Sequence, residues 1–122
     1  METLILYHNP RCSKSRAAAE YLKESGIPFR SVDYLAAPPD VGELREICRK
    51  LGLSDPRGMM RRREEPYARL GLDGDDVAAE TLLAAIAAHP ILLERPIAVY
   101  GDKAAIGRPL DNIAALLDGQ AA

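Results

Sequence analysis

The sequence predicts an α/β fold in which helices pack against a mixed β-sheet. Two observations support this class. The first third of the chain alternates short, apolar, β-prone runs with a helical pattern, and the last third contains a hairpin pattern followed by a helical one. A block of helical patterns separates the two regions. This order of strand, helix, strand, helical block, hairpin and helix is typical of a mixed sheet covered by helices.

The first third predicts a strand, a helix and a second strand. Residues 3–7, TLILY, form an apolar run that the Asn-Pro pair at 9–10 ends, as expected of a buried strand and a turn. A helix should begin near residues 12–13, because apolar residues recur there at helical spacing until Gly26 provides a stop. FRSVDY alternates enough to predict a second strand over 29–34.

The next helix is predicted from a cap and an apolar stripe. Asp40 and Glu43 have capping-box spacing, and Gly52 ends the pattern. Cys48 falls on the stripe among leucine and isoleucine, so we expect it to be a core residue.

Two more helices should complete the helical block. Ser-Asp-Pro at 54–56 is typical of a cap followed by a short helix, which would carry Met59, Met60 and Arg61. A longer helix is expected over about 76–88, and His89 should end it.

The last third predicts a hairpin and a closing helix. PIAVY at 96–100 and KAAIG at 103–107 are β-prone runs joined by Gly-Asp. A final helix is expected from Pro109 through Leu117.

Length and composition predict one folded domain over residues 1–122. Apolar residues make up 48% of the chain and charged residues 28%, which is the profile of a globular protein. A net charge of −2 argues against nucleic-acid binding. No apolar run approaches the roughly 18 residues of a membrane span, and no secretory signal begins the sequence. With only two cysteines, a reducing cytoplasm is the expected location.

Cys12 is the main candidate for chemistry. At the first turn of a helix, unpaired backbone N–H groups and the positive end of the helix dipole favour a thiolate. The neighbouring side chains of His8, Arg11, Lys14 and Arg16 act in the same direction. A polar strand-to-helix turn is an unusual place for a merely buried cysteine, so we predict a nucleophile with a lowered pKa.

Counting along the loop excludes two familiar kinds of cysteine site. A phosphatase-type anion loop needs an arginine six positions after the nucleophile, where this chain has Ala18. A dithiol redox motif needs a second cysteine at the position of Ser15. Cys12 is therefore expected to form a mixed disulfide with an outside thiol.

Candidate anion ligands are scattered through the rest of the chain. Taken singly, each is typical of a solvated surface arginine. Two of them precede a proline, which favours an extended backbone. The candidates are Arg61 to Arg63, Arg95 and Arg108.

Several motifs together resemble one family. They are YHNPRCSKSR at 7–16, YL..PP at 34–39, MRR..EPY..LGL at 60–72, HPILLERPI at 89–97 and GRP at 107–109. Over about residues 4–117 the chain resembles the arsenate reductase family with a thioredoxin-like fold, of the glutathione- and glutaredoxin-dependent type. It carries a variant loop with the sequence RCSKSR.

The resemblance implies a role for five residues. Cys12 would attack arsenate, and Arg61, Arg95 and Arg108 would hold the oxyanion. His8 matches the loop histidine that helps to set the thiolate.

The resemblance also implies a fold: a four-stranded mixed sheet flanked by helices, with an inserted helical block. Pro96 would be cis at the start of the third strand and would place the backbone of Arg95 close to the Cys12 sulfur.

The activity implied is that of an oxidoreductase without a bound cofactor or metal. Cys12 would form a covalent adduct with arsenate. Glutathione, as co-substrate, would displace the adduct, and glutaredoxin would reduce the mixed species, so that arsenite leaves and the redox-active cysteine is regenerated. We expect a monomer.

Two alternatives remain open at this point. In a glutathione-dependent thiol-disulfide oxidoreductase, Cys12 and Ser15 would form a monothiol CxxS arrangement and the arginines would bind glutathione carboxylates. A relative of the Spx regulators would instead bind RNA polymerase, although those usually carry CxxC and lack the histidine matched by His8.

Overall fold

The computed structural model describes residues 3–121. Two compact units make up the chain, and each is described by itself. The first contains the chain up to Ala37 and from Arg95 onward, and the second is Pro38–Glu94. The second unit corresponds to the inserted helical block. That the whole chain behaves as one domain stays a prediction.

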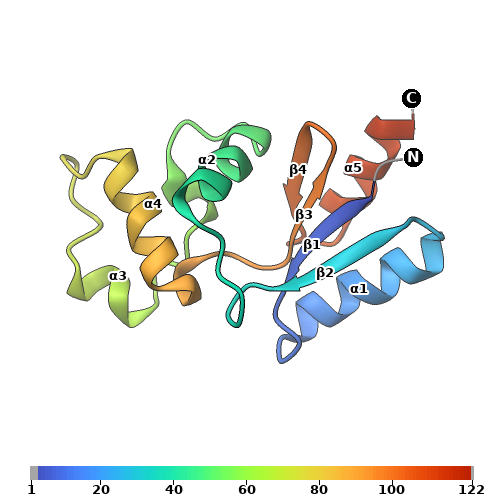
Figure 1. Cartoon of the computed structure of the whole chain (residues 1–122), viewed down its shortest axis with the longest axis horizontal. Coiled ribbons are helices and arrows are strands. Elements are labelled where there is room, and N and C mark those ends of the chain that lie inside the picture. Colours follow the sequence, from blue (N-terminus) through green and yellow to red (C-terminus); the bar gives the residue numbers. More distant parts are fainter. Residues whose placement is uncertain (1–2, 122) are drawn as a thin grey trace. The chain divides into compact units, whose positions relative to one another are not determined.

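The first unit is built on the predicted four-stranded mixed sheet (Figure 1). Its strands are β1 (Leu4–His8), β2 (Phe29–Asp33), β3 (Ile97–Tyr100) and β4 (Lys103–Ile106). The spatial order is β2-β1-β3-β4. β1 is parallel to β2 and antiparallel to β3, which is antiparallel to β4. β1 and β3 are thus the two central strands. The loop with Cys12 follows β1, and Arg95 lies just before β3.

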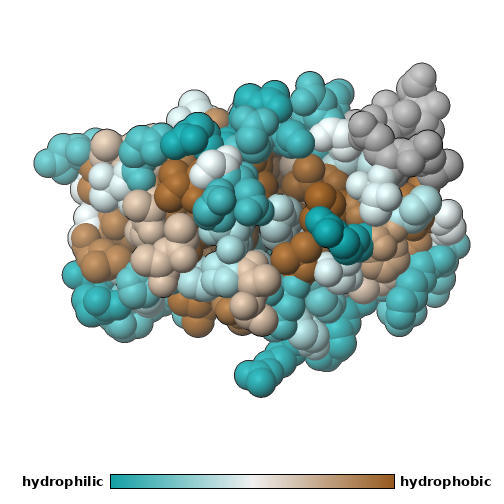
Figure 2. Space-filling view, in the orientation of Figure 1, coloured by the Kyte–Doolittle hydropathy of each residue, from teal (hydrophilic) through white to brown (hydrophobic). Residues whose placement is uncertain are grey.

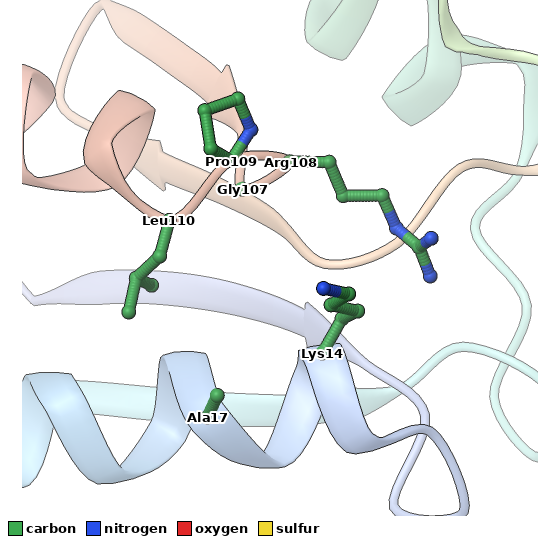
Figure 3. A pocket seen from close by; sticks show the side chains of 6 residues that line it. All are labelled: Lys14, Ala17, Gly107, Arg108, Pro109 and Leu110. Atoms are coloured by element: carbon green, nitrogen blue, oxygen red, sulfur yellow. The ribbon is translucent and has the colours of Figure 1, made fainter.

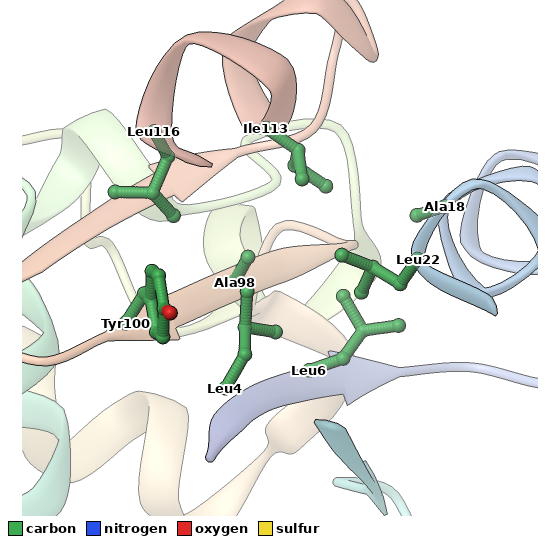
Figure 4. Packing of buried hydrophobic residues seen from close by; sticks show 8 residues of the cluster. All are labelled: Leu4, Leu6, Ala18, Leu22, Ala98, Tyr100, Ile113 and Leu116. Carbon is green, nitrogen blue, oxygen red and sulfur yellow. The ribbon is translucent and has the colours of Figure 1, made fainter. Parts of the chain in front are cut away.

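One face of this sheet is covered by α1 (Ser13–Ser25) and α5 (Asp111–Ala121) (Figure 4). Leu6 is opposite Ala98 in the register of β1 and β3, so both side chains point to the same face. The side chains that meet there are Leu4, Leu6, Ala18, Leu22, Ala98, Tyr100, Ile113 and Leu116. This packing holds α1 and α5 against the sheet.

The ends of α1 lie where the sequence predicts them. Cys12 is the N-cap residue, with an extended backbone. Gly26 is the C-cap residue at φ 72°, a left-handed conformation that glycine adopts without a Cβ penalty, and its N–H donates to the Lys23 carbonyl. The strand, turn and helix at the start of the chain are thus confirmed.

The predicted hairpin is confirmed as well, and the segment after it is tightly packed. Gly107 N–H donates to the Pro96 carbonyl at 2.8 Å. A Cβ at position 107 would lie 2.7 Å from Ile113 Cδ1 and 2.9 Å from Pro96 Cγ. The closing helix begins at Asp111 instead of Pro109, because Pro109 and Leu110 form a turn that hydrogen-bonds to the first helical residues.

The second unit holds five short helices: α2 (Val41–Lys50), the 3₁₀ helix η1 (Pro56–Met59), α3 (Glu65–Arg69), α4 (Ala79–Ala88) and the 3₁₀ helix η2 (Pro90–Leu92). The predicted cap of α2 is present, since Asp40 Oδ1 accepts from the Glu43 N–H at 2.8 Å. Cys48 is buried on this helix, as predicted.

Two boundaries in this unit differ from the prediction, and a third agrees with it. η1 ends at Met59, so Met60 and Arg61 lie beyond it, and Met60 forms a β-bridge with Leu93. α4 begins at Ala79 rather than Asp76, because the preceding residues form a turn in which Val77 N–H donates to the Gly74 carbonyl. His89 ends α4, as predicted.

The surface is mixed in character. Figure 2 shows small apolar patches among hydrophilic side chains on one face. The exposed large apolar side chains are Leu35, Leu70 and Ile91. Within residues 3–121, none of the helices combines the length and the apolar character that crossing a membrane requires.

Candidate active site

The loop that precedes α1 is held by its own polar groups. Asn9 Oδ1 accepts from the Arg11 N–H at 3.0 Å, and the Asn9 carbonyl accepts from the Cys12 N–H at 2.9 Å. The Asn9 N–H donates to Ser15 Oγ at 3.2 Å, and Ser15 is completely buried. Arg16 Nη1 donates to the Pro10 carbonyl at 3.0 Å. The geometry thus gives Ser15 and Arg16 contacts that position the loop.

The Cys12 thiol has a lowered pKa. Burial raises this pKa, but the polarity of the backbone N–H groups of Ser15 and Lys14 lowers it, and so do the side chain and the positive charge of Arg95. The result is a pKa of about 7, compared with an ordinary 9.0. A substantial fraction of Cys12 is therefore thiolate at neutral pH, as its position at a helix N-terminus predicts.

Two of the predicted arginines meet at this sulfur. Arg108 Nη2 donates to Cys12 Sγ at 3.4 Å, and Arg108 Nε donates to the Arg95 carbonyl at 2.6 Å. Arg95 also faces the thiol, since its guanidinium helps to lower the Cys12 pKa. Its Nε is buried without a hydrogen-bond partner among residues 3–121. The Arg95–Pro96 bond is cis, as the resemblance implies.

Arg61 lies in the second unit, between two carboxylates. Its Nη1 is 3.2 Å from Glu64 Oε1, and its Nε is 3.8 Å from Glu94 Oε1. Its backbone N–H donates to the Leu92 carbonyl at 2.7 Å. Its assignment as the third oxyanion ligand stays a prediction.

His8 is the last residue of β1, opposite Asp33 of β2. Its Nδ1 is buried, and no hydrogen-bond partner for it occurs in the described part of the chain. The expected role of His8 in setting the thiolate stays a prediction.

The second cysteine has the properties of a core residue. Cys48 Sγ donates to the Leu53 carbonyl at 3.7 Å. Burial and the nearby charge of Asp55 raise the pKa of Cys48. Burial and the Asp55 charge therefore both oppose the formation of a Cys48 thiolate.

A cavity of about 340 Å³ lies beside the Cys12 loop, within the first unit (Figure 3). Its lining residues are Lys14, Ala17, Gly107, Arg108, Pro109 and Leu110. Sequence reasoning singled out Lys14 and the Gly-Arg-Pro motif separately but not this cavity. Only the packing of α1 against the segment after β4 brings these residues together.

The described chain offers no obvious metal centre. Over residues 3–121 there is no group of three or more histidine, cysteine, aspartate or glutamate side chains that could hold a metal ion. The chemistry available at the site is that of a thiolate flanked by guanidinium and backbone N–H groups, which suits an attack on an oxyanion.

Comparisons with known proteins show which family the chain is similar to. The sequence model of the ArsC family matches residues 7–116. An arsenate reductase from Neisseria meningitidis serogroup A is 54% identical over 117 residues, which are 96% of this chain and 100% of the relative. An arsenate reductase from Escherichia coli is 36% identical, over 96% of this chain and 82% of its own length. The solved structure of an arsenate reductase from Vibrio cholerae has a TM-score of 0.90 at 41% identity, and the match covers 93% of this chain and 96% of that one.

Proposed function

Because the chain belongs to the ArsC family, we propose that it is an arsenate reductase in which the Cys12 thiolate attacks arsenate. The observation that carries this proposal is the placement of Cys12. Its thiol has a pKa of about 7, and Arg108 Nη2 lies 3.4 Å from its sulfur. A nucleophile and an anion-binding group therefore occupy one site.

In the first step, the Cys12 thiolate forms a bond to arsenic, and one arsenate hydroxyl group takes up a proton and leaves as water. Negative charge remains on the other oxygens. The guanidinium groups of Arg95 and Arg108 would neutralise that charge, and we assign Arg61 as the third ligand. Their planar donors match oxyanions and keep their charge at any physiological pH.

In the second step, a glutathione thiolate attacks Cys12 Sγ. A disulfide bond forms, the sulfur–arsenic bond breaks, and arsenic keeps the electron pair and leaves as arsenite after protonation. Two thiols are thus oxidised as arsenic(V) becomes arsenic(III). Glutaredoxin then reduces the mixed disulfide and restores Cys12.

The dependence on outside thiols follows from the cysteines of this chain. The sequence has only Cys12 and Cys48, and Ser15 stands where a dithiol motif has its second cysteine. Because Cys48 is buried and has a raised pKa, it is a poor resolving thiol. Glutathione and glutaredoxin are therefore our proposed co-substrate and partner, with no bound cofactor.

Two further assignments belong to this proposal. We place the enzyme in the cytoplasm, where the thiols that this reaction consumes are kept reduced. We also propose that it acts as a monomer, since both arginines at Cys12 come from the same chain as the cysteine.

The alternatives are less well supported. The relatives named above are arsenate reductases, which favours that activity over a thiol-disulfide oxidoreductase and over a polymerase-binding regulator.

A coupled assay tests the proposal. Purified protein is supplied with arsenate, glutathione, glutaredoxin, NADPH and glutathione reductase, and NADPH consumption is measured. A parallel reaction replaces arsenate with a small disulfide. We expect turnover with arsenate that is lost in Cys12→Ser and retained in Cys48→Ala. Turnover with the disulfide alone would instead identify a thiol oxidoreductase.

A further inference from the structure

The proposed second step requires a thiol to approach Cys12 from outside the chain. The cavity beside the loop is a candidate for that approach, because Arg108, one of its lining residues, also contacts the nucleophile. Arg108 Nη2 lies 3.4 Å from Cys12 Sγ, and Lys14, which also lines the cavity, is in the first turn of the helix that Cys12 caps. A molecule in this cavity would therefore lie against a residue that contacts Sγ.

The cavity has the size of a small-molecule site. Its volume of about 340 Å³ is within the range of roughly 300–1,000 Å³ that is usual for such pockets. Figure 3 shows Lys14 and Ala17 on α1 facing the segment from Gly107 to Leu110, with the Leu110 side chain directed toward the helix. The space is thus bounded by two elements of the same unit.

The lining combines one available cation with apolar surface. Lys14 is exposed, and among residues 3–121 no carboxylate forms an ion pair with its ammonium group. Arg108, in contrast, already uses Nε on the Arg95 carbonyl and Nη2 on the sulfur. Ala17, Pro109 and Leu110 supply the apolar part. A matching ligand has a carboxylate, a compact organic chain and a group that reaches Cys12.

We propose that this cavity binds the reducing co-substrate, a carboxylate-bearing thiol of the glutathione class, with a carboxylate on the Lys14 ammonium and the peptide chain against Pro109 and Leu110. This inference rests on the proposed function and adds a place for its second reactant. The thiol would approach Sγ beside the N-terminus of α1. Charge complementarity at Lys14 distinguishes such a thiol from uncharged ones.

Binding can be measured without any reaction. S-methylglutathione, which has no free thiol, is titrated into ¹⁵N-labelled protein and followed by NMR. We expect chemical-shift changes at residues that line the cavity, such as Ala17 and Gly107. Lys14→Gln should weaken binding about tenfold, as expected for the loss of one charge-assisted hydrogen bond. Lys23→Gln is the matched control, because Lys23 is on the same helix but outside the cavity.

A second variant tests the cavity by shape instead of charge. Ala17 is exposed on α1, so Ala17→Leu fills the space with little risk to the fold. Ala17→Leu should also weaken S-methylglutathione binding.

A kinetic measurement tests the charge of Lys14. In the arsenate assay, Lys14→Gln should lower the ratio of kcat/KM for glutathione to kcat/KM for 2-mercaptoethanol about tenfold. The ratio removes any effect of the variant that is common to both thiols.

The experiments separate an error about the thiol-binding cavity from an error about the arsenate reductase activity. Undetectable binding to the wild type at millimolar concentration, or equal binding by wild type, Lys14→Gln and Ala17→Leu, would overturn the site even if arsenate is reduced. Specific binding that both variants weaken would support the site even if arsenate is not reduced, in which case the proposed function would be wrong.

Discussion

At the scale of single residues, the central feature is the ionisation of Cys12. Its pKa is lowered to about 7, so the thiolate predominates above that pH and is lost as the pH falls through it. We expect the rate of alkylation by iodoacetamide, followed in Cys48→Ala protein, to rise with pH with a midpoint near 7. Arg95→Ala should move the midpoint upward, because Arg95 stabilises the thiolate. A wild-type midpoint close to 9.0 would contradict the assignment.

Arg108 provides a second test at this scale. Its guanidinium spans the Arg95 carbonyl and the Cys12 sulfur. Arg108→Ala should raise the KM for arsenate by about tenfold to a hundredfold, and Arg108→Lys should restore only part of the loss, because an ammonium cannot make both contacts. Arg30→Ala, on an exposed position of β2, is the control. Full activity of Arg108→Lys would show that the two simultaneous contacts of the guanidinium, to the Arg95 carbonyl and to the Cys12 sulfur, are not required.

Individual residues were predicted well where the chemistry is local. Cys12 could be identified from its position at a strand-to-helix turn, and Cys48 from its apolar stripe. In the alternative of a monothiol oxidoreductase, Ser15 is the serine of a CxxS motif. Its actual contact, accepting from the Asn9 N–H, depends on the folded loop, so the sequence contains no direct sign of it.

At the scale of elements, the segment from β4 to α5 carries Arg108 to the site. Gly107 allows it to pass close to Pro96 and Ile113, where a Cβ would lie under 3.0 Å from both side chains. We expect Gly107→Ala to lower the free energy of unfolding by about 1–3 kcal/mol, measured by urea denaturation, and to raise the KM for arsenate as Arg108 shifts.

Gly42→Ala is the control for Gly107→Ala. Gly42 lies within α2, and the nearest atom to an added Cβ is Asp40 Oδ1 at 3.4 Å. Gly42→Ala should therefore stabilise the protein by up to about 1 kcal/mol, as expected for glycine in a helix. Equal effects at the two positions would show that close packing at Gly107 is not the cause.

Helices with a capping residue and a clear apolar periodicity were predicted closely, and short helices were not. α1 and α2 begin and end near the expected residues, because Gly26 and Asp40 act locally. α3 and η2 were missed, since five-residue and three-residue helices leave almost no periodic pattern. The start of α4 was placed three residues early, because the residues before Ala79 form a turn that the sequence pattern does not separate from the helix.

At the scale of the whole molecule, the apolar face of the sheet stabilises the first unit. Leu6 is fully buried there among residues of α1, α5 and β3. Leu6→Ala should lower the free energy of unfolding by about 2–5 kcal/mol, since it removes packing and leaves a cavity. Leu35→Ala, at an exposed position, should cost about 0.5 kcal/mol or less. Similar losses for both variants in urea denaturation would contradict the assigned core.

The meeting of Cys12 with Arg95 and Arg108 is also a property of the whole fold. Arg108 is 96 residues from Cys12, and no local pattern links them. From the residues alone these arginines were typical of a solvated surface, and only the resemblance to a family placed them together. The cavity at Lys14 was not foreseen at all, because it forms only when α1 packs beside the segment after β4.

The most direct test is mass spectrometry of the protein after it is mixed with arsenate and glutathione in the absence of glutaredoxin. We predict that glutathione becomes disulfide-linked to Cys12, that this requires arsenate, and that one arsenite is released for each modified chain. Arsenite release by Cys12→Ser protein, or equal modification of Cys12 without arsenate, would contradict the mechanism.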